Sequence, residues 1–331
     1  MNKANIKILD CTLRDGGYVN DWNFSEECYY DITNRLQDAG VDMIELGLMG
    51  KHNDEHFKTK FRTIEEIPVP EAKNDNVMFT VMMTGNEYKN LVVPDYKRGL
   101  PEAIRFAFFK ADSKDAVSAA GELISKGYKV FMQTMATFQY SDEELDELVS
   151  EVNKIKPYAF YMVDSFGTFY TEDVKNIYSR INESLDKEIL LGFHAHNNLQ
   201  MANANVIQFI NCARDRDVIV DGSIYGMGRG AGNECLELIL HYLERFNSKY
   251  NERPVWELYK KHISAIREKY SWGYLPEQYM VSKYGTNPAY VWYLSKLGIT
   301  DLFQIEQILQ QIPDEKRYTL YKDVIDKLLN M

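Results

Sequence analysis

Short runs of apolar and β-branched residues alternate along most of the chain with stretches in which apolar residues recur every three or four positions. The first pattern predicts buried strands and the second predicts amphipathic helices. Their regular alternation is typical of an α/β protein built on a parallel sheet. The predicted strands are Ile6–Asp10, Met43–Gly47, Val77–Met82, Ala103–Phe109, Tyr128–Thr134, Phe160–Asp164, Leu190–His194 and Val218–Ser223.

Amphipathic segments lie between many of these strands, and polar caps mark where two of them begin. Ser25 precedes two glutamates, and Ser141 is followed three positions later by Glu144, as is typical of a helix N-terminus. Helices are predicted at Ser25–Ala39, Ser113–Lys126, Asp142–Ile155, Glu172–Glu183, Leu199–Ala213 and Gly232–Phe246.

The pattern changes after about Asn247, where strand alternation stops and tyrosine-rich helical segments broken by glycine and proline follow. We therefore predict a (β/α)8 TIM barrel over residues 1–247 and a helical C-terminal region over residues 248–331. A doubly wound parallel sheet is the alternative, but such a sheet gathers its site at a single switch point.

Polar residues stand at or just after the carboxyl ends of several predicted strands. Barrel enzymes assemble their sites from side chains in that position, contributed by many different strands. This distribution favours the barrel. The polar residues concerned are Asp15, Glu45, Lys110, Gln133, Asp164, His194, His196 and Asp221.

Charge and cysteine content narrow the classes of function. The formal net charge of −11 argues against a nucleic-acid partner, because binding phosphates requires a clustered positive surface. The four cysteines form no CxxC pair, so neither a zinc knuckle nor a disulfide framework is indicated, and Cys11 is interpreted as a packing residue. No apolar run approaches the ~18 residues of a membrane span, and the cytoplasm is the expected location.

Two histidines separated by one residue end the seventh predicted strand. In an extended strand His194 and His196 point to the same face, where two imidazoles can bind one divalent metal ion. Asp15, in a glycine-flanked turn after the first strand, is the candidate oxygen ligand, although a carboxylate beside Arg14 also suits a simple ion pair. Two imidazoles and one carboxylate leave coordination positions open for a substrate, which favours Mg²⁺, Mn²⁺ or Fe²⁺ over a closed structural zinc site.

A second glycine-rich segment, residues 226–233 with the sequence GMGRGAGN, follows the last predicted strand. Barrels often bind anions there through backbone amides. Asn233 ends the segment, and it either supplies a fourth metal ligand through its carbonyl oxygen or caps the next helix.

Three motifs together carry a family resemblance. Residues 12–16 (TLRDG), 192–198 (GFHAHNN) and 226–233 (GMGRGAGN), in that order, resemble the DRE-TIM metallolyases, which include the 3-hydroxy-3-methylglutaryl-CoA lyase-like (HMGL-like) enzymes. The similarity covers roughly residues 6–245, and the wording of the motifs is most similar to the 4-hydroxy-2-oxovalerate aldolase branch.

The resemblance implies a divalent ion, Mn²⁺ or Mg²⁺, held by Asp15, His194 and His196, with Asn233 matching a position that coordinates metal in the lyase branch. It also implies that Arg14 faces the substrate carbonyl or enolate oxygen. The reaction implied is cleavage of a 4-hydroxy-2-oxo acid to pyruvate and an aldehyde, with the ion stabilising a pyruvate enolate. Gln133, Asp164 and Ser165 are the predicted substrate-binding residues.

The chain departs from the aldolases at Tyr18, where those enzymes place a histidine that acts as base on the substrate hydroxyl. A phenol is a poorer base at neutral pH than an imidazole. The base therefore stays open among Tyr18, His52, Tyr290 and a hydroxide held by the metal. Glu45 serves either as acid/base or as an anchor for the site, and Lys110 offers a Schiff-base route that the metal motif disfavours.

Other functions remain in competition. A Claisen-type enzyme that condenses an acyl-CoA with a 2-oxo acid would use similar chemistry, as would a 3-hydroxy-3-methylglutaryl-CoA lyase-like enzyme. A barrel enzyme that performs metal-assisted hydrolysis is a third alternative. The aldolase branch also implies a partner, an acylating aldehyde dehydrogenase contacted through the helical tail, so a subunit inactive without that partner is a further alternative. We also expect a homo-oligomer.

Overall fold

Parallel strands close into a barrel in the computed structural model, which describes residues 5–52, 56–72 and 76–329. The strands follow the order β1-β9-β8-β7-β6-β5-β4-β2, and β1 pairs with β2 to complete the cylinder. The short β3 (Lys60–Phe61) extends the edge of β2. The barrel strands are β1 (Ile6–Asp10), β2 (Met43–Met49), β4 (Met78–Thr84), β5 (Ala103–Phe108), β6 (Lys129–Thr134), β7 (Ala159–Asp164), β8 (Leu190–Ala195) and β9 (Val218–Gly222).

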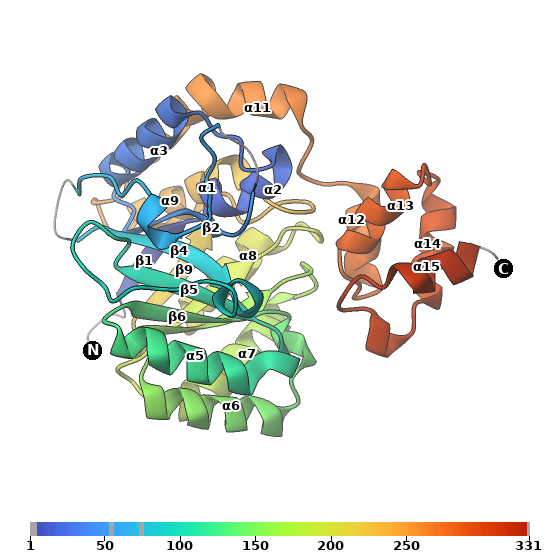
Figure 1. The fold of residues 1–331 in the computed structure, drawn as a ribbon, viewed down its shortest axis with the longest axis horizontal. Coiled ribbons are helices and arrows are strands. Elements are labelled where there is room, and N and C mark those ends of the chain that lie inside the picture. The colour runs from blue at the N-terminus through green and yellow to red at the C-terminus, as the bar shows by residue number, and fades with distance from the viewer. Residues whose placement is uncertain (1–4, 53–55, 73–75, 330–331) are drawn as a thin grey trace.

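Helices cover the outside of this barrel (Figure 1), and the predicted (β/α)8 TIM barrel is confirmed. The Ser25 hydroxyl accepts a hydrogen bond from the Cys28 N–H, and Ser141 forms a capping box with Glu144, so both predicted helix starts are correct. The helices of the barrel region are α1 (Thr12–Asp15), α2 (Gly17–Asn20), α3 (Glu26–Asp38), α4 (Gly85–Tyr88), α5 (Ser113–Ser125), α6 (Asp142–Ile155), α7 (Thr171–Ser184), α8 (Ala202–Cys212) and α9 (Leu236–Glu244).

The helix predicted at Gly232–Phe246 starts later, at Leu236. Gly232 has a φ of +86°, outside the helical region, and Asn233 pairs with His196 in an isolated β-bridge. The segment before α9 is therefore extended chain laid against the end of β8, and Asn233 does not cap the helix.

Two hydrophobic cores sit on opposite sides of the strands. The larger one fills the space between the barrel and its helices, and the smaller one lies inside the barrel and includes Leu9, Met43, Phe131 and Ile219. Above this inner apolar layer the barrel interior is polar, with Glu45, Thr80, Arg105, Gln133, Tyr161 and Asp221 all buried. Barrel interiors are usually filled with branched apolar side chains, so this layer needs an explanation from function.

The C-terminal region is helical, as predicted, and has two parts. Val255 of α10 (Arg253–Leu258) joins the main core, and α11 (Ser264–Lys269) follows it along the barrel. The remaining helices form a separate lobe beside the barrel (Figure 1), with a core of its own that includes Tyr290 and Leu294. These are α12 (Pro276–Lys283), α13 (Ala289–Lys296), α14 (Leu302–Gln311) and α15 (Lys322–Leu329). Among the described helices, none is both long and apolar enough to cross a bilayer.

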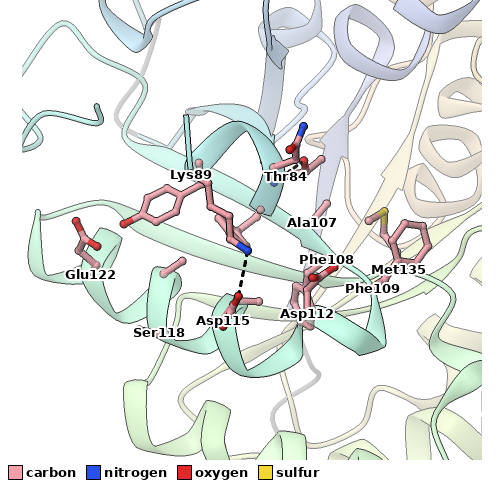
Figure 2. A pocket seen from close by; sticks show the side chains of 16 residues that line it. Thr84, Lys89, Ala107, Phe108, Phe109, Asp112, Asp115, Ser118, Glu122 and Met135 are labelled. Carbon is pink, nitrogen blue, oxygen red and sulfur yellow. Dashed lines mark hydrogen bonds and ion pairs between the residues drawn. The ribbon is translucent and has the colours of Figure 1, made fainter. Parts of the chain in front are cut away.

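A cavity of about 520 Å³ opens beside the ends of β4 and β5, between α4 and α5 (Figure 2). Phe106, Phe108 and Met135 line it, and the Lys89–Asp115 ion pair, 3.1 Å long, crosses it. Its lining includes neither of the two motif histidines nor Asp15. The cavity is therefore distinct from the cluster described next.

Candidate metal centre

Three predicted ligands meet at the carboxyl end of the barrel. Asp15 ends the single-turn helix α1 directly after β1, His194 lies in β8, and His196 follows that strand by one residue. The Nε2 atoms of His194 and His196 lie 3.9 and 3.8 Å from Oδ2 of Asp15, and one ligand atom from each residue falls within 4.8 Å of the others. All three side chains are buried. The spacing suits one cation between them.

Hydrogen bonds on the far side of each ring decide which nitrogen faces the cluster. Nδ1 of His194 lies 2.9 Å from Oδ2 of Asp221, and Nδ1 of His196 lies 3.0 Å from the backbone carbonyl oxygen of Asp164. Because a carboxylate and a carbonyl oxygen can only accept, both rings carry their proton on Nδ1. Each Nε2 lone pair is thereby directed at Asp15.

The ionisation of the cluster also matches metal binding. Burial raises the pKa of Asp15, but the charge of Arg14 and the two histidines outweigh this effect and hold the pKa well below its usual range. Burial and the neighbouring His194 lower the pKa of His196 to about 3. At neutral pH the site therefore presents a carboxylate and an uncharged imidazole, the forms that bind a metal ion.

Several buried polar atoms at this point lack a hydrogen-bond partner among the described residues. They include Oδ2 of Asp15, Nε2 of His194 and Oδ1 of Asn233. A Cβ atom added at Gly228 would lie 2.9 Å from Oδ2 of Asp15 and 2.4 Å from Nδ2 of Asn233, so this glycine leaves the cluster room. Buried polar groups are rarely left unpaired, and two imidazole nitrogens with two oxygens are a donor set that fits a divalent cation.

A chain of buried ions links this cluster to the opposite wall of the barrel. Glu45 Oε2 accepts hydrogen bonds from Nε of Arg14 at 2.8 Å and from Nη1 of Arg105 at 2.9 Å. Arg105 also pairs with Asp221, which in turn holds His194. Nη1 of Arg14 bonds the remaining Asp15 oxygen. The polar layer of the barrel thus fixes both the candidate metal ligands and Arg14.

Arg14 keeps one donor free of this network. Nη2 is buried and has no partner among the described residues, as is also true of Nε2 of Gln133. The other end of the Gln133 amide accepts from Arg105 at 3.2 Å. The Arg14 guanidinium therefore has an available N–H beside Asp15, where an anionic oxygen would complete its hydrogen bonding.

Arg105 was not among the residues selected from the sequence. It is fully buried, and its guanidinium also lies over the ring of Tyr161, 5.1 Å from the centroid. The signal available was a single arginine within an otherwise apolar strand, IRFAF. A buried arginine almost always has a carboxylate partner. Asp221, noted only as a strand-end residue, is one such partner.

Other predicted residues are placed differently. The Asp164 carboxylate accepts from the N–H groups of Thr168 and Phe169 and shapes its own loop, and the Ser165 hydroxyl accepts from Ala136 N–H. The Asp164 carboxylate is thus committed to its own loop, whereas the Ser165 O–H has no acceptor among the described residues and can still donate to a substrate. Lys110 pairs with Glu144 outside the barrel. Burial raises the pKa of the Cys11 thiol well above its usual range, which agrees with a packing role for this residue.

Tyr290 does not join the cluster. It belongs to the core of the C-terminal lobe, where its hydroxyl lies 2.8 Å from the carbonyl oxygen of Thr319 and also bonds that of Lys316. The single hydroxyl proton is shared between these two carbonyl oxygens, and the oxygen accepts from Tyr321 N–H at 3.2 Å, so the hydroxyl is committed to holding that lobe together. The prediction of Tyr290 as a catalytic residue is corrected on this ground.

Comparison with known proteins agrees with this geometry. The HMGL-like family model matches residues 5–259. The chain is 30% identical over 255 residues to a 4-hydroxy-2-oxovalerate aldolase of Bacillus cereus, covering 74% of this chain and 71% of that one. It is 26% identical over 249 residues to an oxaloacetate decarboxylase of Mycobacterium tuberculosis, with 72% and 70% covered.

A solved structure is also similar to this one. The N-terminal domain of a candidate aldolase from Bacteroides vulgatus superposes with a TM-score of 0.72 at 26% identity, covering 88% of this chain and 98% of that one. The similarity thus extends over the barrel and into the C-terminal region.

Proposed function

The chain belongs to the HMGL-like family, and from that premise we propose that it cleaves a 4-hydroxy-2-oxo acid to pyruvate and an aldehyde. The family and the named relatives show a carbon–carbon lyase of a divalent-metal-dependent kind. The choice of substrate is our own inference. It rests on one observation above all: the unpaired Nη2 of Arg14 stands beside the carboxylate that completes the Asp15, His194 and His196 cluster.

The metal would be held by Asp15, His194 and His196, with the Asn233 carbonyl oxygen as a fourth donor. When bound there, a divalent ion supplies a Lewis acid for the keto and carboxylate oxygens of a 2-oxo acid. Asp221 and the Asp164 carbonyl group already orient the two imidazoles, so the site needs little rearrangement when the ion binds.

Cleavage breaks the bond between C3 and C4 of the substrate. A base takes the proton of the C4 hydroxyl, the C4–O bond becomes the aldehyde carbonyl, and the electron pair of the broken bond forms the enolate of pyruvate, which then takes a proton at C3. Arg14 donates from Nη2 to the oxygen on which negative charge grows. Because Glu45 and Asp15 hold the guanidinium on its other edges, that donor is fixed before substrate arrives.

Among the side chains considered as base, we propose His52. Burial raises the pKa of Tyr18, which makes a phenolate at neutral pH still less accessible. His52 follows the carboxyl end of β2 by three residues, and its Nδ1 is buried with no partner among the described residues. An imidazole is suited to accept a proton near neutral pH.

The test is pyruvate release. Protein purified with Mn²⁺ is assayed on a panel of 4-hydroxy-2-oxo acids and on oxaloacetate, with and without an acylating aldehyde dehydrogenase. We expect turnover that a chelator removes and that His196→Ala abolishes, while His241→Ala, at an exposed position, leaves it unchanged. No pyruvate from any member of the panel, or full activity in His196→Ala, would overturn the proposal. Size-exclusion chromatography of the same protein tests the expected homo-oligomer.

A further inference from the structure

Arg229 is a guanidinium without a carboxylate partner at the mouth of the barrel. It lies in the glycine-rich loop after β9, and among the described residues no acidic side chain forms an ion pair with it. Within the described part of the chain, its one side-chain hydrogen bond is a long contact of 3.4 Å from Nη2 to the Ser165 carbonyl oxygen. A guanidinium has five N–H donors, so most of its capacity is available to a ligand.

The loop holds Arg229 in place through its main chain. The Arg229 carbonyl oxygen accepts from Gly232 N–H at 3.0 Å, and the Asn198 side chain accepts from Ala231 N–H at 3.0 Å. None of these bonds involves the guanidinium. The side chain is therefore presented from a fixed backbone and is not needed to build it.

Arg229 faces the same opening as the candidate metal ligands. Its guanidinium carbon lies 5.8 Å from the ring centre of Tyr18. The residue before Arg229, Gly228, lies against the cluster, since a Cβ atom added there would come within 2.9 Å of Oδ2 of Asp15. Tyr18 itself forms no side-chain hydrogen bond with the described residues, and its hydroxyl stays protonated at neutral pH. The Arg229 guanidinium and the Tyr18 hydroxyl, neither of which has an ionic partner among the described residues, thus lie close together.

We propose that Arg229 and the Tyr18 hydroxyl bind a second anionic group of the substrate, a carboxylate or phosphate carried by the part that leaves as the aldehyde. This inference rests on the proposed function. The substrate class would then be 2-oxo acids with a negative charge at each end, one near Arg14 and one at Arg229. Arginine matches both anions with paired hydrogen bonds, so the two sources share one chemistry.

The apolar side of the barrel opening agrees with a substrate that carries its second anion near Arg229. On the side of β2, β4 and β5 the opening is lined by an apolar group of Trp22, Leu48, Met82 and Ala107, with Met135 packed against it. The Trp22 indole N–H is bonded to the Arg14 carbonyl oxygen, and the Lys60 ammonium lies over the Trp22 ring, 4.8 Å from its centroid. Arg229 and Tyr18 supply donors for a second anion that lie outside this apolar group.

Kinetics on paired substrates tests the assignment. Pyruvate release is measured for 4-hydroxy-2-oxo acids of matched length that end in a methyl group, a carboxylate or a phosphate. We expect Arg229→Met to lower kcat/KM for the preferred anionic substrate roughly 10- to 100-fold and to leave the methyl-terminated one within about twofold. Arg229→Lys should restore part of the loss. Arg245→Met, which removes an arginine lying over Tyr242 elsewhere on the protein, is the matched control.

The carboxylate and phosphate arms distinguish the two sources of the anion. An equal loss for the methyl-terminated and anionic substrates would overturn the inference while leaving the proposed function intact, because pyruvate would still be released. Pyruvate release from none of them would instead remove the proposed function.

A binding measurement does not depend on turnover. By calorimetry on the Mn²⁺-loaded protein, 2-oxoglutarate is expected to bind roughly tenfold more tightly than 2-oxobutyrate, and Arg229→Met should abolish that difference. Neither ligand has a 4-hydroxyl group to cleave. Equal affinities in the unaltered protein, or a preference that survives Arg229→Met, would contradict a role of Arg229 in binding the second anion.

Discussion

Oδ2 of Asp221 lies 2.9 Å from Nδ1 of His194, on the side of the imidazole ring that faces away from Asp15. Both residues are buried, and Arg105 lowers the pKa of Asp221 despite the opposing effect of burial, so this carboxylate stays ionised. It fixes the tautomer of the histidine and increases the electron density at Nε2. Asp221 touches no metal position itself, yet it positions a ligand.

Asp221→Asn should therefore weaken metal binding with little change in the position of His194. The amide is nearly isosteric but carries no charge, and loss of such a partner typically costs about 10- to 100-fold in metal affinity. Titration with Mn²⁺, followed by electron paramagnetic resonance, measures the effect. Asp215→Asn, at an exposed residue paired with Lys187, is the control and should bind the metal as the unaltered protein does. Unchanged affinity in Asp221→Asn would show that the bond to His194 is dispensable.

Arg105→Met should destabilise the fold strongly. The arginine pairs with Glu45 and Asp221 in the barrel interior, and its removal leaves Asp221 buried without a counter-charge and Glu45 with Arg14 alone. Breaking a buried ion pair from one side costs about 3–5 kcal/mol. Urea denaturation measures the free energy of unfolding.

The matched control is Arg35→Met. Arg35 pairs with Glu257 on the surface, where both side chains are largely exposed, and such a pair contributes about 0–1 kcal/mol. A comparable loss in the two variants would mean that the buried network adds nothing to stability. A double variant, Arg105→Met with Asp221→Asn, should recover part of the loss, because it removes the carboxylate that has lost its counter-charge.

The period of the hydrophobic pattern predicted the strands, and the polar residues at their carboxyl ends favoured a closed barrel over a doubly wound sheet. Each predicted run overlaps a barrel strand of the structure, with ends that shift by a residue or two, as at β2, which continues to Met49. The start of the helix after the glycine-rich loop was harder to predict. The apolar periodicity of residues 236–244 suggests a longer helix, and Gly232 lies outside it because of a positive φ that the sequence does not display. Helix starts marked by a serine cap were predicted because the cap is a local interaction.

A site residue could be predicted where its role follows from its place at the end of a strand, and could not be predicted where its role depends on partners far away in the sequence. Asp15, His194 and His196 come together because all three lie at the carboxyl ends of strands in one closed sheet. Arg105 was missed because its partners, Glu45 and Asp221, are 60 and 116 positions away, and no local pattern connects them. Tyr290 was misplaced because the partners of its hydroxyl, Lys316 and Thr319, lie 26 and 29 positions away, and no local pattern connects them.

Stability should fall as the pH rises, in part because of Asp10. Burial raises the pKa of this carboxyl group from 3.8 to about 7, against the hydrogen bonds from Thr12. The folded state therefore holds a proton that the unfolded chain has lost. The contribution is fully present below about pH 4 and disappears as the pH rises through 7, on the order of a few kcal/mol. Unfolding in urea at pH 5 and pH 8, with a chelator present, measures the change.

Asp10→Asn should flatten that dependence, since the amide cannot lose a proton in this range. Asp115→Asn, at an exposed carboxylate paired with Lys89, should leave it as steep as in the unaltered protein. An Asp10→Asn variant whose stability still falls to the same extent between pH 5 and pH 8 would assign the effect to other groups.

The base on the substrate hydroxyl is the last feature that a pair of variants can decide. His52→Gln should lower kcat about 100-fold or more, because general-base catalysis contributes about 10²–10⁴. Tyr18→Phe should lower kcat far less, since the raised pKa of Tyr18 leaves the phenol protonated and unable to accept a proton throughout the working range. His241→Gln, at an exposed histidine, is the control. The reverse pattern, a large loss of kcat in Tyr18→Phe and a small one in His52→Gln, would transfer the role to the phenol at the position where the aldolases have their histidine.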